Sequence, residues 1–160
     1  MARSPANPPP RLSLFDRLLQ GDSIETDRNA ERAMRQVREG VRRDLEILFT
    51  TRPRYVSMPA ELPELGKSML SFGMPDLQTQ QLATPAQQEN FRRQLEQLIR
   101  RYEPRFNDVS VELVVGDGEL DRTLRFRVNA VLITDSITEA ISYDTLIDPV
   151  SGDLLLVGDR

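Results

Sequence analysis

The sequence predicts an α+β fold, with helices first and a four-stranded antiparallel sheet after them. Apolar residues recur at helical spacing as far as Tyr102, and from Val109 onward they alternate with polar residues. Elements that are segregated along a chain in this way are typical of α+β domains. With 160 residues, the chain has room for one domain of ordinary size.

The N-terminal region is predicted to be an arm followed by one short helix. Residues 1–10 contain four prolines, so we expect residues 1–12 to form a disordered arm and residues 13–160 to form a single domain. Ser13 is a suitable N-cap and Gly21 a suitable stop for a short amphipathic helix between them. A helix of that length is not stable alone.

A long amphipathic helix is predicted from Asn29 to about Thr51. Its apolar residues lie three or four positions apart and are Ala30, Met34, Val37, Val41, Leu45 and Leu48. The other face carries a run of arginines that includes Arg35, Arg38 and Arg42. Two interpretations stay open: a solvated face whose arginines pair with acids such as Glu39 and Glu46, or a surface that binds acidic partners.

A second long helix is predicted to begin after residues 52–83, which are irregular apart from one short helix at about 62–71. Its N-cap is Thr84, with Pro85 in the first helical position and Gln87 completing a capping box. Its buried stripe is predicted to be Phe91, Leu95, Leu98, Ile99 and Tyr102.

Four strands are predicted in the last third of the chain. Apolar residues alternate with polar ones over residues 109–115, 124–132 and 141–147, and a fourth, apolar strand runs from Leu154 to Val157. Turns rich in glycine and aspartate separate the first strand from the second and the third from the fourth.

Composition excludes several functional classes. The chain has no Cys and no His, so disulfides, thiolate or imidazole metal sites and Ser-His-Asp triads are excluded. A net charge of −4 argues against a dedicated nucleic-acid-binding protein. No apolar run approaches the roughly 18 residues of a membrane span, and the N-terminus does not resemble a signal peptide. We therefore expect a cytoplasmic protein that neither binds nucleic acid nor inserts into a membrane.

Three local patterns resemble cofactor or metal sites, and each lacks an essential part. Gly66-Lys67-Ser68 lacks the first glycine of a phosphate-binding loop, because Glu61 stands at that position. The glycines of the loop at 116–118 lack a third partner, and the acids at 117, 119 and 121 lack the order of a calcium loop. No cofactor and no metal is predicted.

The tripeptide Glu103-Pro104-Arg105 ends the second long helix and is the main candidate site. A carboxylate at a helix C-terminus opposes the helix dipole, so local stability does not account for Glu103. Either Glu103 pairs on the surface with Arg100 and Arg101, or the tripeptide is a rigid acid–guanidinium fork that binds a partner. We predict that Glu103, Pro104 and Arg105 contact a partner subunit, and that Arg105→Ala changes stability by only about 0.5 kcal/mol.

The last predicted strand is a second candidate site. Leu154, Leu155, Leu156 and Val157 form a short strand with little charge. Soluble proteins rarely leave such an edge bare, so we predict that a strand of a partner adds to it. The alternative is that this strand lies inside the sheet, whose edges are covered by the N-terminal arm.

Five blocks of residues, in order along the chain, resemble one protein family. They are Ser13 through Leu18, Val41 through Glu46 with Leu48 through Arg52, Ser71 through Asp76, Tyr102 through Arg105 with the valine-rich strand after it, and Leu124 through Val128. The family is the baseplate wedge subunit of contractile injection machines: the lysozyme-like phage baseplate protein and its type VI secretion counterpart, TssE. The first and third blocks are closer to TssE, and the Glu-Pro-Arg triplet is the family's signature.

The resemblance implies a lysozyme-like baseplate wedge fold and a structural role without enzymatic activity. Such a protein would link the wedge to the contractile sheath and help to start sheath polymerisation, with the last strand as the docking strand. The implied partners are the baseplate subunits TssF, TssG and TssK and the sheath proteins TssB and TssC. The implied location is the cytoplasm, in a baseplate at the inner membrane.

Two other functions are weighed against this one. A peptidoglycan hydrolase needs a general acid beside a second carboxylate, roughly 5–10 Å away. The arginines near Glu103 in the sequence would favour its ionised form, and a cytoplasmic chain does not reach the cell wall. An adaptor that shares the fold would bind a regulator instead of baseplate subunits.

Overall fold

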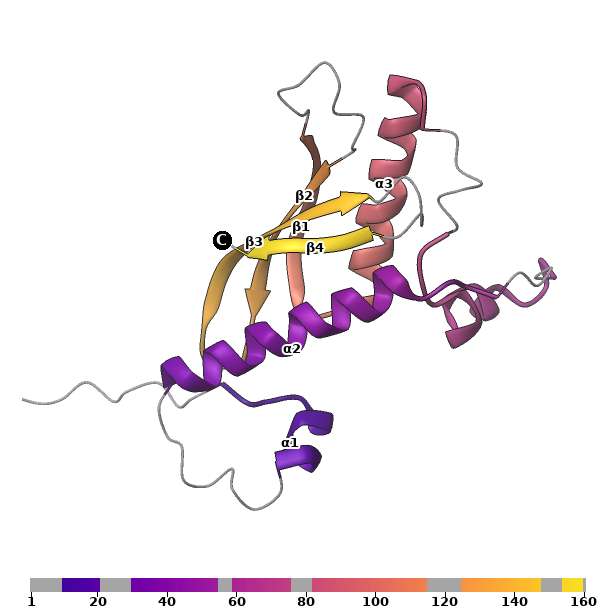
Figure 1. The fold of residues 1–160 in the computed structure, drawn as a ribbon. Helices are drawn as coiled ribbons and strands as arrows, with labels where there is room; N and C mark the ends of the chain where they lie inside the picture. Colours follow the sequence, from indigo (N-terminus) through magenta and orange to yellow (C-terminus); the bar gives the residue numbers. More distant parts are fainter. Residues whose placement is uncertain are drawn as a thin grey trace, which may run out of the picture.

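The computed structural model describes residues 10–20, 30–54, 59–75, 82–114, 125–147 and 154–159. It confirms the predicted α+β arrangement, with helices followed by a four-stranded antiparallel sheet (Figure 1). The helices are α1 (Leu14–Gln20), α2 (Ala30–Thr50), the 3₁₀ helices η2 (Pro63–Lys67) and η3 (Met69–Ser71), and α3 (Pro85–Tyr102). The strands are β1 (Phe106–Val114), β2 (Arg125–Ile133), β3 (Thr138–Ile147) and β4 (Leu154–Asp159).

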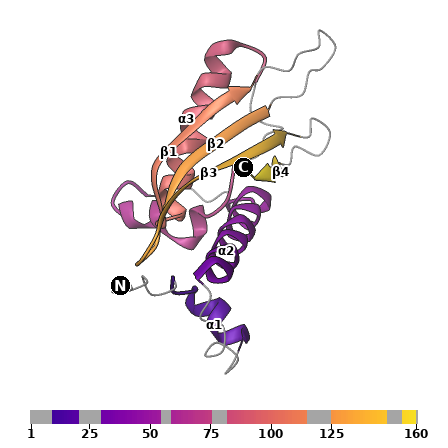
Figure 2. The same cartoon turned by 90° about the vertical axis from the view of Figure 1, so that its left-hand side faces the viewer.

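The sheet is a meander in which each strand pairs with the next along the chain, in the order β1-β2-β3-β4. Figure 2 shows β1, β2 and β3 side by side, with β4 beyond β3 at the far edge. Alternate residues of β2 are buried as predicted, namely Phe126, Val128, Ala130 and Leu132. This inner face forms the core together with α3, which lies against β1, and α2, which lies against β4.

The long helices bury most of the predicted stripes, but Leu98 and Tyr102 of α3 are only partly buried. In α2 the buried residues include Met34, Val37, Val41, Leu45 and Leu48. In α3 they are Phe91, Leu95 and Ile99. The predicted capping box at the start of α3 is confirmed, because the Gln87 N–H donates to Thr84 Oγ1 at 3.3 Å and the Thr84 N–H donates to Gln87 Oε1 at 3.0 Å.

The irregular segment contains η2 and η3 in place of the single short helix expected at about 62–71. Ser68 is extended, with a ψ of 175°, and separates the two 3₁₀ helices. Its hydroxyl caps η3 by accepting from the Leu70 N–H at 3.3 Å. Gly66 disfavours a continuous α-helix, and a competing cap from Ser68 completes the break.

Several predicted features lie outside the described residues. These are residues 1–9 of the arm, the turns at 116–118 and 148–153, and the acidic cluster at 117, 119 and 121. Leu12, at the end of the predicted arm, packs against the core. The division between arm and domain at residue 12 stays a prediction.

Candidate functional site

The Glu103-Pro104-Arg105 turn joins α3 to β1. The Glu103 N–H donates to the Ile99 carbonyl at 2.8 Å, and Pro104 then prevents the helix from continuing. The chain reverses at once, because the Phe106 N–H donates to the Glu103 carbonyl at 3.2 Å. The Glu103 side chain lies inside the protein and is only 4% exposed.

Arg105 holds the Glu103 carboxylate through three donors. Its Nε donates to Oε1 at 2.6 Å, its Nη2 to Oε2 at 2.5 Å, and its backbone N–H to Oε1 at 3.2 Å. Bidentate charge-assisted pairs of this kind are both strong and rigid. The acid–guanidinium fork is therefore present, and its two side chains bind each other.

A series of ion pairs extends this fork to the first two helices. Arg105 Nη2 also donates to Asp44 Oδ2 at 2.5 Å. Asp44 Oδ1 lies 3.8 Å from Arg43 Nε, and Arg43 Nη2 donates to Asp16 Oδ1 at 2.9 Å. We call Glu103, Arg105, Asp44, Arg43 and Asp16 the ion-pair chain. It connects α1, α2 and the turn after α3.

Two members of the ion-pair chain, Arg105 and Asp16, are held in their charged forms. Burial alone would lower the pKa of the Arg105 guanidinium, but hydrogen bonds and negative charge from Glu103 and Asp44 raise that pKa above its ordinary value. Burial would raise the pKa of the Asp16 carboxyl, but hydrogen bonds from Ser13 and from the arginine in α2 bring it below its ordinary value. These two groups are fixed charges, which suits holding a structure or a partner better than transferring protons at neutral pH.

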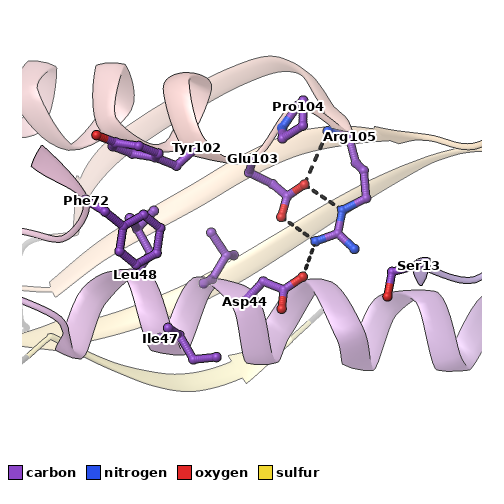
Figure 3. Close-up of a pocket in the computed structure, with 10 residues that line it drawn as sticks. Ser13, Asp44, Ile47, Leu48, Phe72, Tyr102, Glu103, Pro104 and Arg105 are labelled. Atoms are coloured by element: carbon purple, nitrogen blue, oxygen red, sulfur yellow. Dashed lines mark hydrogen bonds and ion pairs between the residues drawn. The ribbon is translucent and has the colours of Figure 1, made fainter. Parts of the chain in front are cut away.

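A groove of about 400 Å³ lies between α2 and the turn (Figure 3). Its apolar end is lined by Ile47, Leu48, Phe72 and Tyr102, and its polar end by Asp44, Arg105 and Ser13. Within the described residues, the Nη1 of Arg105 makes no hydrogen bond. The groove thus combines an apolar surface with a guanidinium donor that has no partner among the described residues.

Residues 71–74 fix the apolar end of the groove. The Ser71 and Tyr102 hydroxyls are 2.8 Å apart, and the Phe72 ring packs edge-on against the Tyr102 ring, with centroids 5.1 Å apart. Gly73 has a φ of 112°, and a Cβ there would lie 2.4 Å from the Thr51 carbonyl oxygen. Only glycine therefore fits where this segment crosses the end of α2.

One interpretation of Glu103 is wrong: it does not pair with Arg100 and Arg101. Arg100 pairs with Glu96 at 2.9 Å, and Arg101 donates to the Gly66 carbonyl at 3.0 Å. Glu103 is instead buried against Arg105.

Asp44 and the apolar wall of the groove are site residues that sequence reasoning did not find. The local signal for Asp44 is weak, since it is one acid directly after two arginines on a charged helix face. Ile47 carries a clearer signal in the sequence, because it is an isoleucine off the predicted buried stripe of α2. In the structure it is 48% exposed.

Among the described residues, partners are found for two of the three predicted arginines of α2. Arg38 pairs with Glu139 of β3 at 3.2 Å. Arg42 pairs with Glu46 at 3.0 Å, which is the i,i+4 contact that the solvated-face interpretation predicts.

The second candidate site, β4, lies at an edge of the sheet, so the alternative that places it inside the sheet is wrong. Leu154 is 1% exposed, whereas Leu155 and Val157 are 45% and 65% exposed. The register with β3 shifts between Leu156 and Gly158, which makes Val157 a bulge. Among the described strands, none pairs with the outer side of β4. None of its residues lines the groove, so the two candidate sites are separate.

Two other features are absent from the described parts of the chain. None of their helices combines the length and the hydropathy that crossing a membrane requires. Nor do three or more of their acidic side chains gather where they could hold a metal ion.

Comparison with known proteins assigns the family. No match is found among the curated proteins. The sequence pattern of the family described as baseplate wedge protein gp25 matches residues 35–137, which is more than half of the chain. The matched range contains Asp44, Glu103 and Arg105, while α1 and β4 lie outside it. As the five blocks predict, the chain belongs to the baseplate wedge protein gp25 family.

Proposed function

We propose that the chain is a TssE-type wedge subunit of a type VI secretion baseplate that links the wedge to the contractile sheath and helps to start sheath polymerisation. The family match over residues 35–137 carries this proposal, because it supports a structural role in a baseplate. The assignment to the type VI form rests on the resemblance of the blocks Ser13 through Leu18 and Ser71 through Asp76. The proposed location is the cytoplasm, in a baseplate at the inner membrane.

The groove is proposed to bind the wedge subunits TssF, TssG and TssK. An apolar side chain of a partner fits beside Ile47 and Phe72, and a carbonyl or carboxylate group fits the free Nη1 of Arg105. Pro104 is exposed and Arg105 is partly exposed, so these two are the members of the tripeptide that contact the partner. Glu103 is buried and contributes by holding Arg105 in place.

The open edge of β4 is proposed to dock the sheath proteins TssB and TssC. A strand added there forms main-chain hydrogen bonds, each of which contributes about 0.5–1.5 kcal/mol net. Leu155 and Val157 are the exposed side chains that such a strand would meet.

The geometry at Glu103 gives no support to the hydrolase alternative. Both Glu103 oxygens accept hydrogen bonds from Arg105, and Asp44 shares the same guanidinium. A glycosidase instead needs one protonated carboxyl group and a second carboxylate on opposite sides of a substrate bond. Here the two carboxylates share one arginine instead.

Co-purification and sheath imaging test the proposed function. The full chain, co-expressed with TssF, TssG and TssK, is expected to co-purify with them. Leu155→Pro and Val157→Pro each remove one main-chain donor from β4, and Leu155→Lys puts a charge on its edge. All three variants should still bind the wedge subunits but fail to support sheaths of fluorescent TssB.

Ile133→Lys is the matched control, because Ile133 and Leu155 are 46% and 45% exposed and only Leu155 is on an edge strand. It should leave sheath assembly unchanged. Normal sheaths with both folded proline variants would contradict the docking role of β4. No binding of the unmodified chain to the wedge subunits would contradict the baseplate role.

A further inference from the structure

The apolar side chains of α1 are largely exposed. Leu14, Phe15, Leu18 and Leu19 are 68%, 60%, 73% and 68% exposed. Successive helical residues are about 100° apart, so these four fall within an arc of about 140° on one side of α1. Contiguous exposed apolar patches of this kind mark interaction surfaces.

The polar side of α1 is bound to α2. Asp16 accepts from Arg43 Nη2 at 2.9 Å and from Ser13 Oγ at 2.6 Å. Gly40 makes room for this contact, because a Cβ at that position would lie 3.2 Å from Asp16 Oδ2. Amphipathic helices normally turn their apolar side to the core. In α1 the arrangement is reversed, and the polar contacts fix the apolar side outward.

Charge decides what kind of surface can cover α1. Asp16 is the one acid of α1, and its side chain is 14% exposed and paired with Arg43. Arg17 lies next to Leu14 on the helix surface and forms no ion pair within the described residues. On the other side, the Arg43 guanidinium lies 5.6 Å from the centroid of the Phe15 ring. Arg43 is itself paired with Asp16, so the open surface is apolar and the charge at its border comes from Arg17.

We propose that α1 is a docking helix that inserts its apolar side into an apolar groove, rimmed by carboxylates, on a neighbouring baseplate subunit. This inference rests on the proposed function and adds a contact surface to it. Leu14 and Leu18 are the i and i+4 anchors of such a contact. The Asp16–Arg43 pair orients α1 before binding, which reduces the conformational entropy lost on association. A second copy of this surface fits less well, because Asp16, the one acid of α1, is already paired with Arg43 and offers no partner to the Arg17 of the other copy.

Co-purification of the full chain with TssF, TssG and TssK tests the inference. The double variant Leu14→Ser/Leu18→Ser should reduce the co-purified amount at least tenfold without lowering the melting temperature, because both side chains are exposed. Arg17→Glu should weaken binding several-fold and reduce its sensitivity to salt. The control Leu62→Ser/Met69→Ser changes two leucine-sized side chains that are 54% and 80% exposed outside α1 and should have no effect.

A photo-crosslinking residue at Leu18 identifies the occupant. The expected product is a crosslink to a baseplate-subunit peptide that contains apolar residues flanked by Asp or Glu. A crosslink to a second copy of the chain would overturn the inference. It would also be overturned if the double variant lost binding to anionic vesicles but still bound the wedge subunits. A double variant that co-purifies with as much of the wedge subunits as the unmodified chain does would overturn it as well. If the unmodified chain does not co-purify with them, the proposed function fails first and the inference falls with it.

Discussion

The Glu103-Pro104-Arg105 turn and the β4 edge differ in how much of their hydrogen-bonding capacity the chain itself uses. At the turn, both oxygens of Glu103 and two of the guanidinium nitrogens of Arg105 have partners within the chain. At β4, the outer side pairs with no described strand. Substitutions at the turn should therefore lower the free energy of unfolding first, whereas substitutions on the outer side of β4 should first impair assembly with a partner.

The largest expected loss of stability comes from Arg105→Ala, which breaks the Glu103–Arg105 pair. The variant leaves the buried Glu103 carboxylate without its partner, and such losses cost about 3–5 kcal/mol. This is well above the surface-level cost expected from the sequence. The free energy of unfolding, measured by urea denaturation, checks the prediction.

The control for Arg105→Ala removes both charges. Replacing a buried pair by apolar residues of similar volume is often neutral, so Glu103→Leu/Arg105→Met should be much more stable than Arg105→Ala. A single variant that is no less stable than wild type would show that the fork does not contribute to folding.

The two sides of β4 provide the next contrast. Leu154 is 1% exposed and faces the core, so Leu154→Ala should cost about 2–3 kcal/mol. Leu155 is 45% exposed, so Leu155→Ala should stay within about 0.5 kcal/mol. Urea denaturation of both variants gives the difference directly. Equal losses would mean that β4 is not held by its inner face.

A smaller effect is expected at the segment that closes the apolar end of the groove. Gly73→Ala forces a residue with a Cβ into a positive φ and against the Thr51 carbonyl, and such strain costs about 1–3 kcal/mol. The control is Gly66→Ala, since a Cβ at Gly66 meets no atom within 4 Å. Melting temperatures of the two variants should differ clearly, and similar values would contradict the assigned role of Gly73.

The smallest predicted effect is the pH dependence of the Asp16–Arg43 pair. The pKa of Asp16 lies below its ordinary value of 3.8. The stabilisation is therefore fully present above pH 3.8 and is lost as the pH falls through the lower folded-state pKa. Asp16→Asn should cost up to about 1 kcal/mol at pH 7 and almost nothing in strong acid. A cost that is independent of pH would show that the charge is not responsible.

The sequence predicts those features that depend on neighbouring residues. The stripe of α2, the capping box at Thr84 and the alternation in β2 follow from local spacing, and the structure confirms them. Of the contacts that Arg105 makes, the one to Glu103 could be predicted from the sequence and the one to Asp44 could not. Arg105 is two residues from Glu103, but Asp44 is 61 positions from Arg105, and no periodicity encodes such a contact. The sequence predicted one short helix where the structure has η2 and η3, because the spacing of apolar residues does not show whether Ser68 continues a helix or caps a new one.

The bulge at Val157 limits how strongly β4 of a single subunit can bind a partner strand. It leaves only Leu154 through Leu156 in one uninterrupted register with β3. A template that short captures a strand weakly, so a single free subunit would not seed a sheath. Under the proposed function, copies brought together in a completed baseplate raise the effective concentration of the edge and make capture favourable. The bulge would then delay sheath growth until the baseplate is assembled and prevent free subunits from starting it in the wrong place.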